Sequence, residues 1–464
     1  MFELFFGREK ELSKLEQQYQ SDKFEFPVIY GRRRVGKTEL IKHFLQDKKA
    51  IYFQGIAGTD KQNLEALAKT IFEYRNKSFS DELTYQSMAG ALDDITALMK
   101  AEKLVFVIDE FPYLAEASPS ISSLLQYYID HQWKALDSML ILCGSSMSFI
   151  EKQVLSAKSP LYGRDITRYK LFPFTFKETK YFLDNVSIQD AVAYYAMTNG
   201  VPYYLGLINQ NQSVMENIES LFLDNTAKLF EEPLNLLNME VRDPSLYLAI
   251  LNAVAAGNNK YNEISTKTGL SSSHIAPLLG NLIELGLIEK ISPLPTGSKK
   301  GLYQIKDGLY RFWFTFVSPN VNFIEIGRIQ AVKMMIEARF TTFLGPIFED
   351  ICRSWLIDES DNKKLPLMLT DVGRWWGGNP KTKQQEEIDI TGIGIKEDEL
   401  LLGECKWTSQ SPTLPMLEKL IDRSRLFNHR HKYMYFFSKV AFSDRVIAFA
   451  KTEHIRLITL DNLY

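Results

Sequence analysis

The chain is poor in cysteine and has no long apolar run. Its 464 residues include three cysteines, Cys143, Cys352 and Cys405, which lie far apart and show no metal-ligand spacing. This scattered, odd set argues against a disulfide framework and fits a reducing compartment, so we expect a cytoplasmic location. The longest apolar runs have the length of strands, far below the roughly 20 residues of a membrane helix, and the apolar start is too short for a secretory signal. We therefore expect a soluble protein without membrane association.

Neither sign of charge dominates the chain. The net charge is −3, so no field over the whole chain draws it to nucleic acid, and any such binding has to come from local patches. The hydrophobic fraction of 45% and the charged fraction of 24% are those of an ordinary globular protein. At about 100–200 residues per domain, the length predicts several domains, each able to bury a core.

The order of apolar patterns divides the chain into four predicted parts. Residues 1–175 alternate helical patterns with β-branched runs at 26–30, 50–54, 103–109 and 139–144, which predicts a parallel sheet covered on both faces. Residues 176–240 show helical patterns alone, and residues 241–325 show a helix-turn-helix followed by a hairpin. Residues 326–464 begin with a long helical pattern and continue with strands. The predicted fold class is α/β, with a helical and a winged-helix part between two α/β domains.

The segment "GRRRVGKT" follows the first predicted strand and precedes a helix, which is the context of a phosphate-binding loop. Glycines let backbone amides approach phosphates, and the start of the next helix adds its positive dipole end. In such a loop Lys37 reaches the β and γ phosphates, and the Thr38 hydroxyl binds Mg²⁺. We therefore predict ATP and Mg²⁺ as cofactors, bound by Gly31, Arg32, Arg33, Arg34, Val35, Gly36, Lys37 and Thr38.

A second acidic element supports this site. The buried run "LVFVIDEF" ends at Asp109 and Glu110, where parallel strands present their carboxyl ends. Alone, an acidic pair at a strand end is often only solvated. Together with the loop, Asp109 is predicted to hold Mg²⁺ and Glu110 to polarise the attacking water.

Five segments in this order resemble an AAA+-type ATPase group related to the STAND ATPases and called the archaeal ATPase family. They are "FFGREKELSKLE", "YGRRRVGKTEL", "VIDEF", "CGSSMSF" and "SPLYGRD". The resemblance implies that Phe6, Gly7 and Arg8 lie near the adenine and that Ser145 or Ser146 is the first sensor. It also implies that residues 1–175 form the ATPase core and residues 176–240 a lid.

The resemblance suggests further nucleotide contacts. Arg164 precedes a strand where such families place an arginine finger for a neighbouring subunit, although an arginine there also complements a helix C-terminus, and Arg168 is a rival. Gly200 and Pro202 match the Gly-x-Pro turn with which STAND lids contact the nucleotide.

The winged-helix pattern spans residues 261–305, and its role stays open. Residues 271–285 contain no Lys or Arg, and Pro277 and Gly280 are expected to weaken the second helix. Lys299 and Lys300 are the basic pair at the tip of the hairpin. Reading of DNA and use as a packing or partner-binding module are both possible, and the lack of basic side chains favours packing.

The stretch "EEIDITGIGIKEDELLLGECKW" carries a second candidate site. Side chains alternate along a strand, so Glu404 and Lys406 share one face, and pairing as a hairpin brings Asp389 beside them. Two carboxylates form a hard oxygen site for Mg²⁺, and a lysine can orient the attacking water. Alternating acidic residues on a half-exposed strand are more commonly a solvated face, and that interpretation remains the alternative.

This pattern resembles the PD-(D/E)XK nuclease superfamily, which commonly provides the C-terminal domain of the archaeal ATPase family. The resemblance supplies an upstream helical glutamate, Glu349, and the preceding "GRWWG" segment. Nearby basic residues are either phosphate contacts or solubilising groups: Arg374, Lys381, Lys383, Arg423, Arg425, Arg430 and Lys432.

The favoured hypothesis is an ATP-operated switch that controls a Mg²⁺-dependent nuclease-like domain acting on nucleic acid, most simply DNA. One alternative is a DNA-binding regulator in which ATP controls the winged helix. Another is a signalling scaffold that forms homo-oligomers and has no nuclease role.

Overall fold

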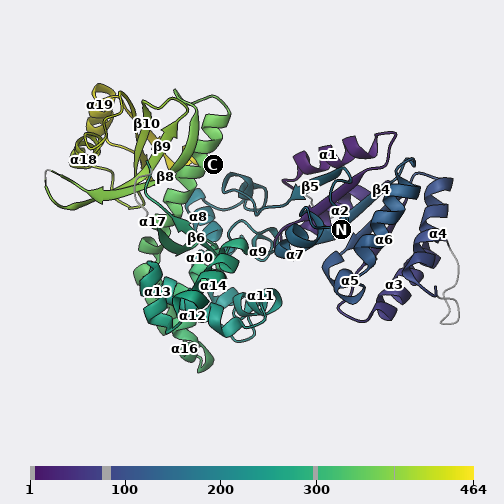
Figure 1. The fold of residues 1–464 in the computed structure, drawn as a ribbon. Helices are drawn as coiled ribbons and strands as arrows, with labels where there is room; N and C mark the ends of the chain where they lie inside the picture. The colour runs from purple at the N-terminus through teal and green to yellow at the C-terminus, as the bar shows by residue number, and fades with distance from the viewer. Residues whose placement is uncertain (1–5, 76–84, 296–300, 381) are drawn as a thin grey trace. The chain divides into compact units, whose positions relative to one another are not determined.

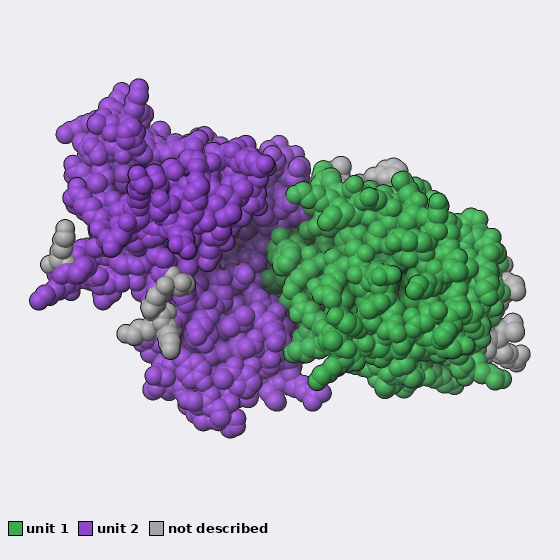
Figure 2. Space-filling view, turned by 45° about the horizontal axis from the view of Figure 1, so that its top comes forward, with its two compact units in different colours: residues 1–173, 201–203 green, residues 174–200, 204–464 purple. Residues whose placement is uncertain are grey.

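The computed structural model describes residues 6–75, 85–295, 301–380 and 382–464. The chain divides into two compact units, one made of residues 1–173 and 201–203 and the other of residues 174–200 and 204–464 (Figure 2). The predicted domain boundaries after residues 175, 240 and 325 stay predictions. Over the described ranges, no helix has the length and apolar character needed to cross a membrane.

The first unit is built on a five-stranded parallel sheet, as predicted. Its strand order is β2-β3-β4-β1-β5, and every neighbouring pair is parallel. This order places the central strand β4 between β3 and β1, so the segments that follow β1 and β3 meet at one edge of the sheet. The strands are β1 (Phe26–Tyr30), β2 (Ala50–Gln54), β3 (Val105–Asp109), β4 (Met139–Gly144) and β5 (Ile166–Lys170).

Helices cover both faces of this sheet (Figure 1). Because side chains alternate along a strand, Phe106 and Ile108 enter one apolar cluster with α3 to α6, while Val105 and Val107 enter another with α1 and α2. The helices are α1 (Glu9–Tyr19), α2 (Lys37–Leu45), α3 (Asp60–Tyr74), α4 (Met88–Ala101), α5 (Phe111–Ala117), α6 (Ile121–Tyr128) and α7 (Met147–Phe149).

The stretch between the two sheets is helical and contains one hairpin, formed by β6 and β7 in antiparallel register. Its second predicted helix, α14, runs without a break through Pro277 and Gly280, because buried Ile275, Leu279 and Leu282 hold one face in place. Lys299 and Lys300 lie outside the described residues. The elements are α8 (Ile188–Thr198), α9 (Pro202–Leu205), α10 (Val214–Phe222), α11 (Glu232–Glu240), α12 (Pro244–Ala255), α13 (Tyr261–Thr268), α14 (Ser272–Glu284), β6 (Ile288–Ile291), β7 (Leu302–Ile305), α15 (Gly308–Phe312) and α16 (Val321–Glu325).

The C-terminal part is a mixed sheet with helices on both faces. Its order is β12-β11-β10-β9-β8; the two pairs at β9 are antiparallel, and β10, β11 and β12 are parallel. Leu400, Leu402 and Phe436 pack under α18 and α19, whereas Phe437 contacts Trp355 of α17 on the other face. The elements are α17 (Ile329–Asp361), β8 (Leu369–Gly378), β9 (Gln385–Gly394), β10 (Glu399–Lys406), α18 (Leu414–Ser424), β11 (His431–Ser438), α19 (Asp444–Thr452) and β12 (Ile455–Thr459).

Candidate functional sites in the two units

The phosphate loop links β1 to α2, and its glycines adopt a backbone that other residues rarely take. Gly36 has φ 89° and precedes the first residue of α2, Lys37. Gly31 lies so close to the backbone of Leu171 that a Cβ added to the glycine would lie 2.3 Å from the Leu171 carbonyl oxygen. Glycine at these two positions therefore permits the backbone path of the loop.

Lys37 is folded back over this loop. Its Nζ donates to the carbonyl oxygens of Gly31 at 2.9 Å and Arg32 at 3.0 Å. Burial lowers the pKa of Lys37, although the carboxylates of Asp109 and Glu110 act in the opposite direction. The ammonium thus lies at the centre of the predicted phosphate site.

The two predicted magnesium ligands of this unit are already in contact. Thr38 Oγ1 donates to Asp109 Oδ2 at 3.0 Å, although the two residues come from different elements. Tyr52 of β2 donates to the same carboxylate oxygen, and burial raises the pKa of its phenol. A hydroxyl and a carboxylate in this arrangement are hard oxygen ligands suited to Mg²⁺.

Glu110 follows Asp109 and has the strained φ of 47°. Its Oε2 accepts from the Ser145 hydroxyl at 2.9 Å and from the Ser145 backbone N–H at 3.3 Å. Ser145 was predicted as a nucleotide sensor, and the structure places it on the predicted catalytic acid. Ser146 begins α7 and makes no capping hydrogen bond there.

The remaining loop residues have distinct surroundings. Arg33 donates to the Tyr113 hydroxyl at 3.1 Å, and Arg34 lies 4.2 Å above the ring of Tyr203. Val35 is fully buried in the core below the loop. Arg8 donates to the Val35 carbonyl at 3.2 Å, which places it against the loop, while its predicted position near adenine stays a prediction.

The predicted Gly-x-Pro turn also reaches the loop. Pro202 Cγ lies 4.0 Å from the position of a Cβ added to Gly36. Gly200 has φ 67°, and an added Cβ there would lie 2.0 Å from the Phe174 carbonyl oxygen, so only glycine fits. Pro202 therefore lies beside the loop, and its contact with a nucleotide stays a prediction.

Arg164, the predicted arginine finger, is paired within its own chain. Two of its nitrogens donate to the Asp130 carboxylate at 3.3 and 2.9 Å, and the third donates to the Tyr162 carbonyl at 2.6 Å. Its rival, Arg168, donates to the Leu155 carbonyl at 3.3 Å. A finger role for either stays a prediction about a neighbouring copy.

The C-terminal acids and lysine converge. The hairpin of β9 and β10 forms as predicted, with Leu402 opposite Thr391, and brings Asp389 to the end of β10. Lys406 Nζ donates to Glu404 Oε2 at 3.1 Å and lies 3.7 Å from Asp389 Oδ2. The Cys405 N–H between them donates to that Asp389 oxygen at 2.9 Å.

Cations surround the buried Glu404. Arg423 at the end of α18 donates to Glu404 Oε1 at 2.6 Å and to Glu386 Oε2 at 3.0 Å. Burial raises the pKa of Glu404. Burial alone would lower the pKa of Lys406, but the two carboxylates outweigh it and raise that pKa.

Glu349 lies next to this group on α17. Burial and then the Asp389 charge raise its pKa to about 7, while Arg353 and Arg374 oppose the shift. Arg353 joins the two acids, because its NH1 donates to the Asp389 carbonyl at 2.8 Å and to Glu349 Oε2 at 3.5 Å. Beneath them, Cys352 and Cys405 are buried thiols whose pKa values burial raises.

Asp389 and Glu404 provide the oxygen donors that Mg²⁺ prefers, but they do not form a preformed metal site. Both are oxygen donors, yet the oxygens of Glu404 already accept from Arg423 and Lys406. Among the described residues, no group of three or more His, Cys, Asp or Glu is arranged to hold a metal ion. A divalent ion at this site therefore has to compete with the cations of the chain.

Two of the predicted basic residues are also engaged. Arg374 contacts Gln304 and lies 3.8 Å from Glu387, and the exposed Arg425 pairs with Asp422 at 2.8 Å. Lys381 lies outside the described residues.

Sequence reasoning missed several residues of both sites. The four-residue spacing between Glu349 and Arg353 on a helix is a signal that could have identified Arg353. Tyr52 lies on β2, the half-buried edge strand of the first sheet, and offered no such signal. Arg423 was counted among possible phosphate contacts, and its pairing with Glu404 depends on the position of α18 against β10.

A parallel sheet with a glycine loop, a buried lysine and a Thr–Asp pair at the strand ends defines the P-loop nucleotide-binding class. A family model for the ATPase domain predominantly from Archaea matches residues 5–208, and the chain belongs to this ATPase family. Residues 313–415 match a second family model, of archaeal and bacterial proteins of unknown function.

Individual relatives agree. An uncharacterized protein of Methanocaldococcus jannaschii, MJECL04, is 33% identical over 87% of this chain and 88% of its own length. An uncharacterized ATP-binding protein of the same organism, MJ0423, is 50% identical over 10% of this chain and 78% of its own length. The Walker-type ATPase PABY2304 of Pyrococcus abyssi shares the fold, with a TM-score of 0.51 and 20% identity over 67% of this chain and 96% of that one.

Proposed function

We propose that this ATPase is a nucleotide-operated switch whose C-terminal domain is a Mg²⁺-dependent nuclease acting on nucleic acid. The convergence of Asp389, Glu404 and Lys406 at the paired strand ends carries the proposal. The buried, free cysteines are in keeping with the reducing cytoplasm proposed as its location.

In the first unit, Lys37 would bind the β and γ phosphates, and Thr38 and Asp109 would hold Mg²⁺. The ion supplies charge stabilisation to the transferring phosphoryl group. Glu110 orients and polarises the attacking water, and Ser145 fixes the Glu110 carboxylate for that task. Pro202 lies close enough to the loop for the lid to respond to the state of the nucleotide.

In the second unit, Asp389 and Glu404 would hold Mg²⁺, which stabilises charge on a phosphodiester and provides an activated water. Lys406 lies between these carboxylates and is placed to orient that water. Glu349, with its raised pKa of about 7, can accept or return a proton near neutral pH.

A second function is favoured by the ion pairs at Glu404. Because Arg423 and Lys406 already neutralise this carboxylate, the same fold can bind nucleic acid without cutting it. The protein would then be an ATP-controlled DNA-binding regulator.

The test is an assay of DNA cleavage with Mg²⁺ or Mn²⁺, with and without ATP, on linear, branched and single-stranded DNA. Lys406→Ala is expected to abolish cleavage, and Lys37→Ala to lower ATP hydrolysis at least about a hundredfold and to alter the ATP dependence of cleavage. Arg445→Ala, which removes an exposed side chain of α19 in the same domain, serves as the matched control and should cut normally.

Cleavage that survives in Lys406→Ala would count against the proposed site. Salt-sensitive DNA binding without cleavage by the wild type would support the regulator instead.

A further inference from the structure

The candidate metal site is assembled from separate elements, and one arginine joins two of them. Arg353 lies one helical turn after Glu349 on α17 and donates to the backbone carbonyl of Asp389 on β9. It is largely buried, with 15% of its side chain exposed. The spacing between the helix that carries Glu349 and the strand that carries Asp389 therefore depends on Arg353.

Arg353 is itself held from the opposite side. Its NH2 donates to Asp350 Oδ1 at 2.6 Å, and Asp350 Oδ2 accepts from Arg311 NH1 at 3.3 Å. Burial alone would raise the pKa of Asp350, but the two arginines lower it, so the carboxylate stays charged between them. Asp350 is thus a bridge between α17 and α15.

Arg311 connects this bridge to the hairpin. Its NE and NH2 both donate to the Ile305 carbonyl, at 3.0 and 2.9 Å, where β7 ends. The hairpin also contacts β8: the Leu294 N–H donates to the Arg374 carbonyl at 2.9 Å, and Gln304 accepts from the Arg374 side chain. The hairpin and α15 are therefore fastened to both elements that flank the candidate site.

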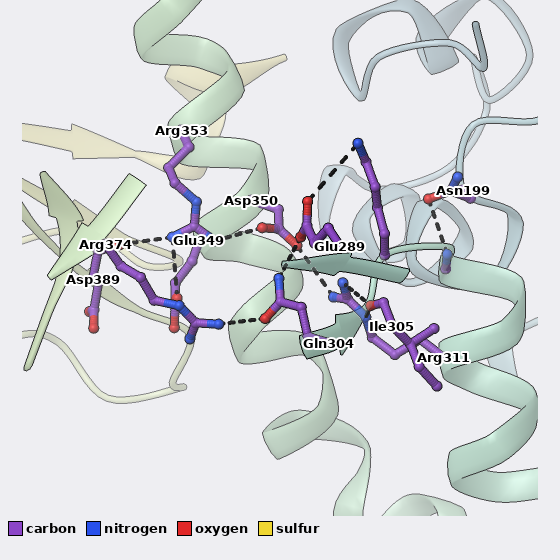
Figure 3. A network of polar contacts seen from close by, with 12 residues as sticks. Asn199, Glu289, Gln304, Ile305, Arg311, Glu349, Asp350, Arg353, Arg374 and Asp389 are labelled. Carbon is purple, nitrogen blue, oxygen red and sulfur yellow. Dashed lines mark hydrogen bonds and ion pairs between the residues drawn. The ribbon is translucent and has the colours of Figure 1, made fainter. Parts of the chain in front are cut away.

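The start of α15 is fastened to the residue before the Gly-x-Pro turn. The buried Asp307 caps α15 by accepting from the Tyr310 N–H at 3.0 Å. Asn199, at the end of α8, accepts from the Gly308 N–H at 3.1 Å and donates to Asp307 at 3.4 Å. Figure 3 shows the contact of Asn199 at the start of α15 and, apart from it, the contacts of Arg311 with Ile305 and Asp350 and the position of Arg353 beside Asp350 and Asp389.

We propose that Arg353 is a positioning residue for the candidate metal site and that Arg311 sets its position through Asp350. The inference rests on the proposed function, because it concerns the same acids. It assigns to the hairpin and α15 the role of controlling how well Glu349 and Asp389 are aligned. A displacement of α15 thereby changes the affinity of the candidate site for the metal ion.

The effect follows from how partners outside the metal ligands act. Groups that orient ligands typically change metal affinity by about 10–100-fold when they are removed. Arg311→Gln removes one of the two arginine charges that contact Asp350. Arg311→Lys keeps a cation at this position but loses the paired donation to the Ile305 carbonyl. The two variants therefore separate control through Asp350 from simple support of the β7 end.

The experiment measures Mn²⁺ binding to the full chain by calorimetry, without nucleotide. The component that belongs to the site is the one lost in Asp389→Asn. Arg311→Gln and Asp350→Asn are expected to weaken that component about tenfold, and Arg353→Gln at least as much. Arg311→Lys should restore most of the affinity, and Arg445→Gln, at an exposed position of α19, should leave it unchanged. ATP binding in each variant checks that the chain is folded.

Unchanged Mn²⁺ affinity in both Arg311→Gln and Asp350→Asn would overturn this inference and leave the proposed metal site standing. Equal weakening in Arg311→Gln and Arg311→Lys would also overturn it, since the loss would then come from the β7 end. If the wild type has no component that Asp389→Asn removes, the proposed function and this inference fail together.

Discussion

The two acidic sites of this chain are held in opposite ways. In the first unit, Asp109 and Glu110 accept hydrogen bonds from the neutral hydroxyls of Thr38, Tyr52 and Ser145. In the second unit, Glu404 accepts from the cations Lys406 and Arg423. Neutral donors orient a carboxylate and leave its charge for an incoming cation, whereas bound cations cancel that charge.

This difference has an energetic consequence. A buried carboxylate without a counter-charge is costly, and a pair of buried charges recovers this cost only with good geometry. The C-terminal site carries its own counter-charges and can remain folded without a metal. At the proposed N-terminal site an ion would meet carboxylates whose charge is not cancelled by a hydrogen-bonded cation among the described residues, whereas at the proposed C-terminal site it would have to replace a cation of the chain.

The largest expected effect comes from removing that internal counter-charge. Within the described part of the chain, Arg423→Gln leaves Lys406 as the one cation that contacts the buried Glu404 carboxylate. In the absence of metal, the free energy of unfolding of this variant is expected to be lower by about 3 kcal/mol. Mn²⁺ should then stabilise this variant more than it stabilises the wild type. Urea unfolding with and without Mn²⁺ measures both quantities.

The matched control is Arg425→Gln, an exposed pair worth at most about 1 kcal/mol. Equal Mn²⁺ stabilisation of Arg423→Gln and the wild type would contradict the competition between Arg423 and the metal.

A second effect depends on pH. Because the pKa of Glu349 is raised from 4.5 to about 7 in the folded chain, its contribution to stability is complete below the unfolded value and is lost as the pH rises through about 7. Glu349→Gln cannot ionise. Relative to the wild type it should gain up to about 3 kcal/mol of unfolding free energy between pH 4.5 and 8.

Urea unfolding in chelator at several pH values checks this expectation. The same measurement on Glu397→Gln, which replaces an exposed carboxylate of the same domain, is the control. A difference for Glu349→Gln that does not grow with pH would show that the carboxyl is not buried in this way.

The smallest expected effect tests the neutral donors. Ser145→Ala removes one hydrogen bond to a charged carboxylate, worth about 1.5–3 kcal/mol, and should lower kcat for ATP hydrolysis at least about tenfold. KM should change little, since Ser145 contacts Glu110 rather than the loop. Steady-state kinetics of Ser145→Ala beside Ser146→Ala separates the two serines, and a loss in KM alone would favour the sensor role predicted from the sequence.

Local patterns predicted much of this molecule. Four of the five strands of the first sheet, the loop from Gly31 to Thr38 and the shared face of Glu404 and Lys406 follow from spacing over a few residues. The β9–β10 hairpin was predicted correctly because the two runs alternate and are separated by a short polar turn.

Contacts between distant residues were beyond that reasoning. Arg311 meets Asp350 across 39 positions and Asn199 meets Asp307 across 108, and no periodicity encodes either pair. A helix weakened at Pro277 was predicted, and α14 is continuous there because burial of one helix face outweighs the lost hydrogen bond. Composition predicts which faces are apolar but not which polar side chains meet once those faces have packed.

The reactivity of the three buried thiols reports on local opening of the chain around them. Cys143 lies in the core of the first sheet, and Cys352 and Cys405 lie beneath the second candidate site. Burial keeps each thiol protonated and out of reach of alkylating reagents, so the labelling rate of each follows the free energy of the opening that exposes it. Labelling resolved by peptide would thus give an opening energy for each thiol, one in the first unit and two in the second.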